Sequence, residues 1–471
     1  MTSLGYDQLT PLEWLMPRVY IRQIFAFPSN NTRSIPEKLR EGLVGVIKDV
    51  PYLLSGVVSS DSPRGAVSLT EPYQSLNDLF SWHDLSQSID YPRMKKDNFP
   101  PAAFSVPGLV PPDTIPPYPT PAPVFRARVS LVNGGFLLCV AVHHNTTDIT
   151  GFGALLKLWA SHCRTGASAS LGFNQTWLDR RLLFPSEAAR RKSSIAIPQL
   201  LHIREPTESI SRGGVVGDVV EFRPGVFFFP WRTLQQAKQA VNNEIATHNP
   251  GSWVSTSDIL TALLWSAVVE AELLDSDSGS QGVSTIGFPV NIRSRPRVSL
   301  PKDYLGAAFM MTTATASQQD LVCQSRAENK SASAENLEAS AVTALSRIAL
   351  AIRRSVNSVD GTAVPKVLEY VNSQAGIQPI VLGPRHDGIS IVSWADQGVY
   401  DLDWGAMIGR CEAVRLPKLM NRRYPIIQPR IPESSDDEGG FEVIVSYDGA
   451  TFERFEKSGS VMRFATLRCT S

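Results

Sequence analysis

Two adjacent histidines followed by an aspartate are the residues of this chain whose types and spacing best suit chemistry. They stand in the string His143-His144-Asn-Thr-Thr-Asp148. A histidine is the usual general base near neutral pH, because its unperturbed pKa of about 6.5 lets it take and return a proton. Adjacent side chains of an extended segment point to opposite faces, so we expect only one histidine to face a cleft. Asp148 could hold that imidazole or brace the loop.

Two further interpretations of these residues stay open. The histidines could be satisfied structural residues at the end of a strand, or they could bind a metal. A metal site would need a third ligand, and the remaining histidines show no ligand spacing. The five cysteines are dispersed and form no Cys-x-x-Cys pair, which argues against zinc. We therefore expect no bound metal and no bound cofactor.

A second string, Asp401-Leu-Asp-Trp404-Gly405, lies near the C-terminus, and its tryptophan follows Trp394 by ten residues. A buried indole N–H usually needs a partner. Such a donor can face a developing oxyanion. The alternative is ordinary aromatic packing at a corner of the fold.

A third string, VNIRSRP, begins at residue 290 and contains Arg293 and Arg295; LPKDYLG follows it at 300–306. Arginines two positions apart share one face of a strand. One of them could form a bidentate ion pair with a carboxylate such as Asp148. The alternative is a solvated basic edge.

Motifs for a nucleophile or a phosphate loop are missing from the sequence. It contains neither Gly-x-Ser-x-Gly nor Gly-x-Gly-x-x-Gly. If a histidine of the first string is catalytic, the proton that it removes therefore belongs to the substrate. This favours direct group transfer over a covalent enzyme intermediate.

The composition excludes several classes of function. The 471 residues carry 45 Lys and Arg against 45 Asp and Glu, and only 19% are charged. Such a chain lacks the excess of cations that a broad nucleic-acid surface or a polybasic membrane anchor needs. The start shows no signal-peptide pattern, and the apolar run at 259–274 is too short to span a bilayer. With dispersed thiols, these features predict a cytoplasmic protein without a membrane span.

A strand and a helix must position the first string. Residues 125–131 alternate loosely, Asn133-Gly134 is a hairpin turn signal, and residues 136–142 form a continuous apolar run. This pattern predicts a hairpin whose second strand is buried on both faces. A helix is expected over 151–164. The histidines would then lie where a buried strand gives way to a loop and a helix.

Two earlier segments are also distinctive. Ser34-Ile-Pro-Glu37 predicts a capping box that opens an amphipathic helix, which Pro51 ends before a strand at 52–58. Residues 100–123 contain ten prolines and cannot form a helix or a central strand. We expect this segment to be either an extended surface loop or a rim over a binding cleft.

The second half also mixes strands and helices, so a mixed sheet in each half predicts the α/β or α+β class. We place an N-terminal domain at 1–185, a crossover linker at 186–216 and a C-terminal domain at 217–471. The segments expected in the second half are strands at 215–222, 226–229, 285–290, 388–394, 406–413 and 441–447, and helices at 231–241, 256–274, 335–356 and from 449 onward.

Together these strings resemble the plant and fungal CoA-dependent acyltransferases usually called the BAHD family. Its signatures are HxxxD in mid-chain and DFGWG near the C-terminus, which here are His144–Asp148 and Asp401–Gly405, with first residues 257 positions apart. The string at 290–306 and the STSD string at 255–258 are further family features. The segment LTPLEWLMPRVY at 9–20 is similar to the fungal branch that includes trichothecene 3-O-acetyltransferase.

The resemblance implies two chloramphenicol-acetyltransferase-like domains, each a mixed sheet with flanking helices, and an active-site channel at their interface. Acyl-CoA would enter as a co-substrate from one side and a small hydroxylated acceptor from the other. His144 would deprotonate the acceptor, which then attacks the thioester. We expect acetyl transfer to a hydroxyl of a fungal secondary metabolite (a terpenoid, polyketide or alkaloid) by a monomeric protein.

The resemblance also implies roles for single residues. Asp148 would pair with Arg293 and have a structural role. Trp404 is the candidate oxyanion donor, although its loop lies away from the histidine in many family members. Asp401 and Gly405 would support the CoA side of the channel.

Three hydroxyl side chains are the candidate contacts to CoA, namely Ser255, Thr256 and Ser393. Thr256 or Ser257 could instead cap the helix that follows. Both interpretations stay open at the level of the sequence.

Two departures from the family pattern affect the fine geometry. Ile149 stands where the family usually has glycine, and Asp403 replaces the middle glycine of DFGWG. Asp tolerates the left-handed backbone better than most other residues, so the turn can survive.

Two other functions stay open: a condensation-domain-like former of amides or esters, which shares HHxxxD, and a protein of this fold that performs cyclisation or metabolite binding without acyl transfer.

Overall fold

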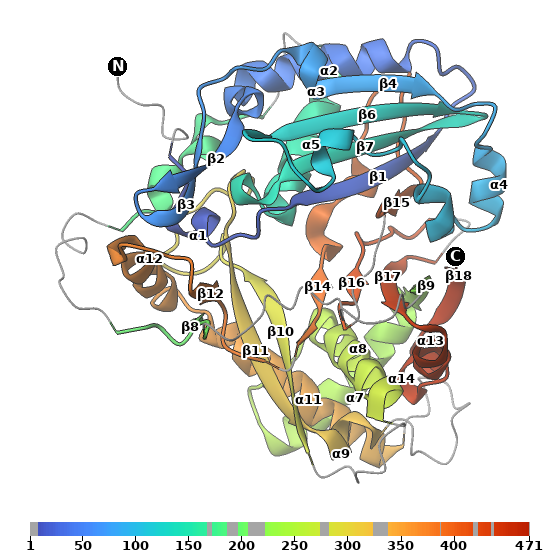
Figure 1. Cartoon of the computed structure of the whole chain (residues 1–471). Helices are drawn as coiled ribbons and strands as arrows, with labels where there is room; N and C mark the ends of the chain where they lie inside the picture. Colours follow the sequence, from blue (N-terminus) through green and yellow to red (C-terminus); the bar gives the residue numbers. More distant parts are fainter. Residues whose placement is uncertain are drawn as a thin grey trace.

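The structure is a computed structural model of the chain that describes residues 8–166, 172–185, 196–205, 222–273, 282–323, 338–386, 388–417, 423–434 and 438–470. Figure 1 shows two lobes, with the N-terminal half above and most of the C-terminal half below. Both lobes combine strands with helices, as the sequence predicts. Within these ranges, no helix is both long and apolar enough to cross a membrane.

A five-stranded sheet forms the framework of the upper lobe, in the order β15-β1-β7-β6-β4. β6 and β7 form the predicted hairpin, and all nine residues of β7 are buried, as expected for a strand covered on both faces. The strands are β1 (Tyr20–Pro28), β4 (Phe80–Asp84), β6 (Phe125–Val132), β7 (Gly135–His143) and β15 (Ala413–Arg415).

β15 comes from the C-terminal part of the chain, yet it completes the upper sheet. Its three residues pair with Ile24, Phe25 and Ala26 of β1, and Figure 1 shows it beneath β1. The strand predicted at 406–413 is wrong in position, because residues 406–408 form a turn and the strand begins at Ala413. The domain limits proposed from the sequence stay a prediction.

Two helices cover one face of the upper sheet, α2 (Ile35–Asp49) and α5 (Ile149–Thr165). Trp159 of α5 packs edge to face against Phe80 and Phe125 of the sheet, and its indole N–H donates to the Leu39 carbonyl of α2. The predicted helix at α2 is confirmed, but its capping box is wrong. Ser34 has helical rather than extended backbone angles, so its side chain makes no capping hydrogen bond.

The proline-rich segment covers the opposite face of this sheet. It contains two 3-10 turns, Pro101–Phe104 and Pro112–Thr114. Phe104 is buried in one hydrophobic cluster with Leu137 of β7. The segment is therefore neither helix nor central strand, as predicted, and it packs on the sheet rather than extending freely over the surface.

The lower lobe contains a second five-stranded sheet, in the order β14-β16-β17-β9-β18. Residues 259–273 of the apolar run belong to α8, which packs among five other helices as the buried helix that the sequence predicts. These strands are β9 (Arg223–Pro230), β14 (Val392–Ser393), β16 (Ile426–Ile427), β17 (Gly440–Tyr447) and β18 (Thr466–Thr470); the helices are α7 (Trp231–His248), α8 (Thr256–Leu273), α11 (Ala339–Ser358), α13 (Gly449–Glu456) and α14 (Gly459–Phe464).

A long antiparallel ribbon, β10 (Val283–Asn291) and β11 (Phe309–Ser317), reaches from the lower lobe to the upper one. Figure 1 shows these yellow strands rising toward the upper sheet. β13 (Ile389–Ser390) pairs in parallel with β10. At the upper end of the ribbon, Asn291 donates to the Thr150 hydroxyl of α5 at 3.3 Å, so the ribbon meets the beginning of α5.

The strand predicted at 52–58 begins late, because a 3-10 turn occupies Pro51–Leu54. The strand expected at 215–222 lies almost wholly outside the described residues. In the described ranges, the other α-helices and strands are α1 (Pro11–Trp14), β2 (Gly56–Asp61), β3 (Arg64–Leu69), α3 (Leu76–Leu79), α4 (Tyr91–Lys96), β5 (Ala122–Pro123), β8 (Leu201–Ile203), α9 (Gln318–Leu321), α12 (Ala363–Ser373) and β12 (Ile380–Leu382).

Candidate active site

The candidate site is the turn that joins β7 to α5. Residues 144–146 form a 3-10 turn directly after the strand, and the His144 amide donates to the Val19 carbonyl at 2.8 Å. Asp148 then caps α5, because its Oδ1 accepts from the Gly151 amide at 2.9 Å. Strand pairing therefore fixes one end of the turn, and a helix cap fixes the other.

The His144 imidazole is held through Nδ1, which lies 3.1 Å from the Thr147 carbonyl oxygen. A carbonyl only accepts, so Nδ1 carries the hydrogen and Nε2 keeps a free lone pair. Burial lowers the pKa of His144 below its ordinary value, and the opposing effects of Asp148 and Thr147 do not outweigh it. The imidazole is therefore neutral near pH 7. Its ring centroid lies 6.2 Å from that of Phe309 at the start of β11.

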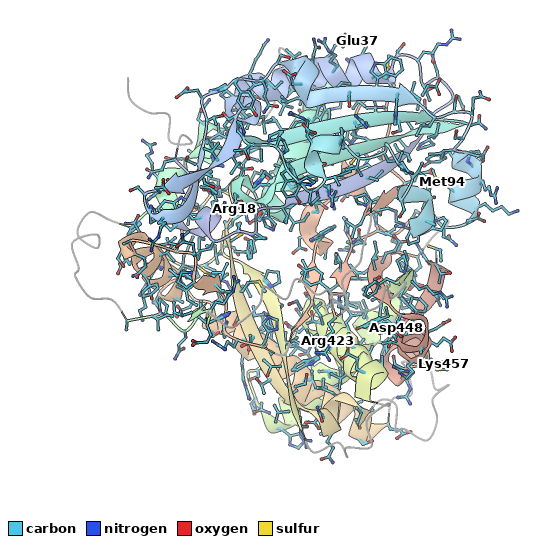
Figure 2. All side chains as sticks on the ribbon, in the orientation of Figure 1. Arg18, Glu37, Met94, Arg423, Asp448 and Lys457 are labelled. Atoms are coloured by element: carbon cyan, nitrogen blue, oxygen red, sulfur yellow. The ribbon has the colours of Figure 1, made fainter. Side chains whose placement is uncertain are left out.

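The neighbouring His143 is turned into the upper lobe, as the alternation of an extended segment predicts. Its ring packs edge to face on Tyr20 at 5.1 Å. Burial, His144 and Arg18 together lower the pKa of His143 to about 4. Arg18, labelled in Figure 2, lies at the lower edge of the upper lobe and donates to Ser59. Of the two adjacent histidines, His143 therefore packs against β1, and His144 lies toward the start of β11.

Asp148 and Arg293 form the bidentate ion pair that the sequence predicts. The two contacts, Nη1 to Oδ2 and Nη2 to Oδ1, measure 2.8 and 2.9 Å, and both side chains are buried. The Ala308 amide also donates to Asp148 Oδ2 at 2.7 Å. Burial raises the pKa of Asp148, but the charge of Arg293 and these hydrogen bonds outweigh it and leave the pKa lowered. Asp148 is therefore ionised and directed away from the imidazole.

The same arginine ties the turn at 304–308 to the beginning of α5. Arg293 donates to the carbonyls of Tyr304 and Gly306 at 2.9 and 2.8 Å. The turn passes so close to α5 that a Cβ at Gly151 would lie 2.3 Å from the Leu305 carbonyl oxygen. Glycine is thus required two positions after Ile149, and the departure at Ile149 leaves this close approach intact.

Trp404 is not near His144, so its predicted role as oxyanion donor is corrected. Its ring packs edge to face against Phe27 and Trp159, and the residue is only 2% exposed. Phe27 pairs with residue 136, at the opposite end of β7 from His143. Seven residues of strand separate the two ends by roughly 20 Å. The alternative interpretation, aromatic packing, describes Trp404.

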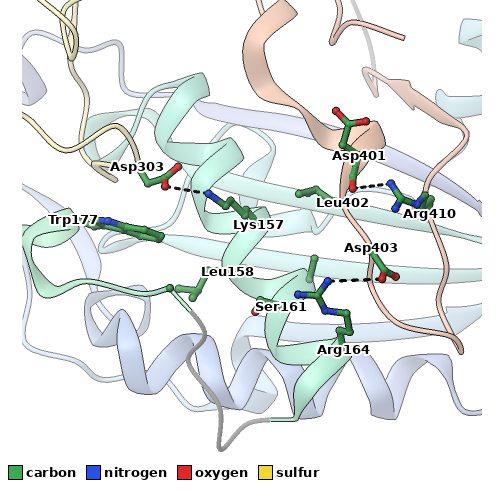
Figure 3. Close-up of a pocket in the computed structure, with 12 residues that line it drawn as sticks. Lys157, Leu158, Ser161, Arg164, Trp177, Asp303, Asp401, Leu402, Asp403 and Arg410 are labelled. Carbon is green, nitrogen blue, oxygen red and sulfur yellow. Dashed lines mark hydrogen bonds and ion pairs between the residues drawn. The ribbon is translucent and has the colours of Figure 1, made fainter. Parts of the chain in front are cut away.

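The loop of Asp401 and Gly405 lies beside the C-terminal half of α5 and borders a pocket of about 350 Å³ (Figure 3). Gly405 has a φ of +92°, which glycine alone adopts readily. Asp403 lacks the left-handed backbone expected of it; its Oδ1 accepts from the Gly405 amide at 2.9 Å instead. Arg410 donates to the Asp401 carbonyl at 2.8 Å. The loop therefore braces α5, and His144 is not among the residues that line its pocket.

Among the described residues, none of the hydrogen bonds made by the three candidate CoA contacts reaches His144. Ser255 forms a capping box with Asp258 at the start of α8, so neither Thr256 nor Ser257 is the cap. Thr256 Oγ1 accepts from Gln235 at 3.1 Å. Ser393 Oγ accepts from the Ala395 amide at 3.4 Å.

A buried ion pair between Glu13 and Arg180 lies behind the histidine turn, and the sequence patterns did not predict it. Arg180 Nε donates to both carboxylate oxygens at 2.9 and 3.0 Å, and its Nη2 donates to the Thr146 carbonyl at 3.1 Å. Glu13 lies in the segment 9–20, which the sequence marked only through its resemblance to a family. In the described parts of the chain, His, Cys, Asp and Glu form no group of three that could hold a metal ion.

The chain belongs to the Transferase family, whose model matches residues 96–462. A second model, the trichothecene 3-O-acetyltransferase-like N-terminal domain, matches residues 19–163. The family that the sequence motifs suggest is therefore confirmed.

Several fungal proteins are similar over most of the chain. O-acetyltransferase ptmV of Penicillium ochrochloron is 24% identical over 462 residues, which cover 90% of this chain and 89% of the relative. O-acetyltransferase dmxR13 of Cryptosporiopsis sp. (strain 8999) is 27% identical over 423 residues, 85% of each chain. Acyltransferase BOA11 of Botryotinia fuckeliana (strain B05.10) is 22% identical over 99% of this chain and 98% of its own. With the family match, these relatives confirm the predicted acyltransferase class.

Solved structures confirm the predicted two-domain fold. F. sporotrichioides TRI101 complexed with coenzyme A and T-2 superposes with a TM-score of 0.78 at 19% identity, over 98% of this chain and 99% of that chain. F. graminearum TRI101 complexed with coenzyme A and deoxynivalenol gives 0.76 at 20% identity, over 98% and 99%. Vinorine synthase gives 0.57 at 17% identity, over 96% and 92%.

Proposed function

We propose that this acyltransferase moves an acetyl group from acetyl-CoA to a hydroxyl of a fungal secondary metabolite, with His144 as general base. The observation that carries this proposal is the anchored imidazole of His144, whose Nδ1 is held by the Thr147 carbonyl and whose Nε2 keeps its lone pair. The fungal O-acetyltransferase relatives and the similar structures complexed with coenzyme A support the choice of donor.

In the proposed reaction, Nε2 of His144 is the atom that takes and returns the proton. His144 Nε2 accepts the proton of the acceptor hydroxyl, and the oxygen attacks the thioester carbonyl carbon. Collapse of the tetrahedral adduct breaks the C–S bond and releases CoA thiolate, to which the imidazolium returns its proton. The products are an ester and CoA with a free thiol, and no bond to the enzyme forms.

In this proposal, Asp148 and Arg293 are braces rather than reactants. Both oxygens of Asp148 are already engaged by Arg293 and by backbone amides, so the carboxylate is not available to the imidazole. Ser255, Thr256 and Ser393 remain proposed contacts to CoA. The channel between the lobes, the monomeric state and the cytoplasmic location remain predictions.

The proposal is tested by transfer of radiolabelled acetyl from acetyl-CoA to a panel of hydroxylated terpenoids, polyketides and alkaloids. General-base catalysis contributes about 10²–10⁴-fold, so His144→Ala should lower kcat by about that factor while the protein stays folded. His143→Gln is the matched control and should keep kcat within about threefold. Equal label transfer by His144→Ala and the wild type would overturn the assignment of the base.

A binding measurement separates acyl transfer from the other functions that share this fold. Calorimetric titration with acetyl-CoA should give saturable binding to the wild type and to His144→Ala, because the base is not needed to bind the donor. Failure of both proteins to bind acetyl-CoA would favour a carrier-protein donor or a protein that performs no acyl transfer.

A further inference from the structure

The histidine turn is held from two sides, and only one of them belongs to the sequence motifs. On one side, Arg293 binds Asp148 and thereby the beginning of α5. On the other side, Arg180 Nη2 donates to the Thr146 carbonyl at 3.1 Å. Arg180 comes from the 3-10 turn Arg180–Leu183, 34 positions after Thr146.

Arg180 is itself fixed by Glu13 of α1. The guanidinium Nε lies 2.9 and 3.0 Å from the two carboxylate oxygens, and the residues are 1% and 0% exposed. The Thr10 amide donates to Glu13 Oε2 at 2.8 Å, within a complete capping box. Tyr52 lies under the guanidinium, with its ring centroid 4.6 Å from Cζ. An arginine held on all these sides cannot change its geometry without breaking several contacts.

The backbone of α1 reaches the same turn by a second route. The side-chain Nδ2 of Asn145 donates to the Glu13 carbonyl at 2.6 Å and to the Met16 carbonyl at 3.1 Å. Asn145 is fully buried and directly follows His144. The segment 10–16 therefore contacts the turn through its backbone as well as through the Glu13 side chain.

Two hydrogen bonds at neighbouring peptide groups connect this ion pair to the His144 imidazole. Arg180 holds the carbonyl of Thr146, which belongs to the same rigid peptide plane as the Thr147 amide. The next carbonyl, that of Thr147, accepts the hydrogen of His144 Nδ1. The direction of that carbonyl decides whether Nδ1 or Nε2 carries the hydrogen, and hence whether Nε2 can act as a base.

We infer that Glu13 and Arg180 are positioning residues for His144, which keep the Thr147 carbonyl directed at Nδ1 and the imidazole in the tautomer that a base needs. This inference rests on the proposed function of His144. On this inference, the N-terminal segment 10–16 helps to position the base of the active site and is not a peripheral extension.

The first test measures the tautomer directly, by ¹⁵N NMR of protein labelled at histidine, with His144→Ala to assign the signal. The wild type should show His144 protonated at Nδ1 and free at Nε2. Arg180→Lys keeps the charge but loses the planar group, so it should give a mixture of tautomers. Glu13→Gln, which is isosteric, should do the same if Arg180→Lys does not fold. Wild-type protein with the hydrogen on Nε2 would overturn the inference without any variant.

The second test is kinetic and includes a matched control. Arg180→Lys should lower kcat about tenfold or more, with KM for acetyl-CoA changed less than about threefold, because a displaced base slows chemistry rather than donor binding. Arg415→Lys disrupts an equally buried ion pair, that of Arg415 with Glu442. Arg415 pairs with Ile24 of β1, and Ile24 pairs with Cys139 of β7. Cys139 lies four residues, and therefore more than about 10 Å, along the strand from His143. Arg415→Lys should lower Tm but leave kcat and the tautomer unchanged.

The outcomes separate this inference from the proposed function. If His144→Ala keeps full activity, the proposed function fails, whatever the tautomer is. If His144→Ala is inactive but Arg180→Lys and Glu13→Gln keep the kcat and the tautomer of the wild type, the inference alone fails. If Arg415→Lys lowers kcat as much as Arg180→Lys does, the effect is general destabilisation, and the inference also fails.

Discussion

Arg415 and Glu442 form a buried bidentate ion pair that joins the sheets of the two lobes. Arg415 lies on β15, the edge of the upper sheet, and Glu442 lies on β17 within the lower one. Nη1 to Oε2 measures 2.6 Å and Nη2 to Oε1 3.2 Å, and Arg468 also reaches Oε1 at 3.1 Å. Asp148 and Arg293, which are 145 positions apart, form a second buried ion pair. Buried charge pairs as well as apolar packing therefore connect the two sheets.

The Asp148→Asn substitution should cost stability as well as rate. The neutral amide would leave Arg293 buried without its counter-charge, which typically destabilises by about 3–5 kcal/mol. Urea unfolding at pH 7 should show this loss, and kcat should fall in the folded fraction. Asp303→Asn is the control, because its partner Lys157 is exposed and such pairs contribute about 1 kcal/mol or less. A lower kcat at an unchanged free energy of unfolding would contradict the bracing role of Asp148.

The pH dependence of kcat should report the lowered pKa of His144. Burial lowers that pKa below about 6.5, so the base is neutral at pH 7 and loses its lone pair only in acid. The value of kcat should be constant from about pH 7 to 8 and fall as pH decreases through a pKa below 6.5. Rates at saturating substrate between pH 5 and 8 check this. An acid limb centred above 6.5 would be incompatible with a buried, neutral His144.

Trp404→Phe should affect folding and not catalysis. The indole fills space between Phe27 and Trp159, so the smaller ring should lower the free energy of unfolding by about 1–3 kcal/mol. The value of kcat should stay within about threefold, because the ring is roughly 20 Å from the histidine turn. A hundredfold loss of kcat at unchanged stability would restore Trp404 as an oxyanion donor.

His143 should make the protein less stable in mild acid. Its pKa is about 4 in the folded protein and about 6.5 in an unfolded chain, so the unfolded state binds the proton more readily. Stability is therefore complete above pH 6.5 and is lost as pH falls toward 4, by up to roughly 3 kcal/mol. His143→Gln removes this contribution. Urea unfolding at pH 7 and pH 4.5 should show a steeper loss for the wild type, and equal losses would exclude His143 as a source.

The parts of the fold that rest on local pattern could be predicted from the sequence. The turn at Asn133-Gly134 and the apolar run after it specify the β6–β7 hairpin, because two-residue turns and burial on both faces leave few alternatives. The helix α8 follows from an apolar run with no polar face. The string at 290–296 suggested an arginine partner for Asp148, and the resemblance to a family singled out Arg293.

The parts that depend on distant segments could not be predicted in this way. The three residues of β15 become a strand only because β1, almost 400 positions earlier, supplies its hydrogen-bond partners. Glu13 and Arg180 are 167 residues apart, and neither stands in a pattern that indicates burial. Trp404 stands in a recognisable motif, but its packing partners Phe27 and Trp159 lie elsewhere in the chain, and the motif does not indicate them.

The origin of β15 has a consequence for synthesis of the protein. When the first half of the chain has emerged from the ribosome, the edge strand β15 has not yet been synthesised. Ile24, Phe25 and Ala26 of β1 then lack the strand with which they pair in the folded protein. The upper lobe becomes complete only after residue 415 emerges. Until then the nascent first half exposes an unpaired sheet edge, a feature that promotes aggregation during synthesis.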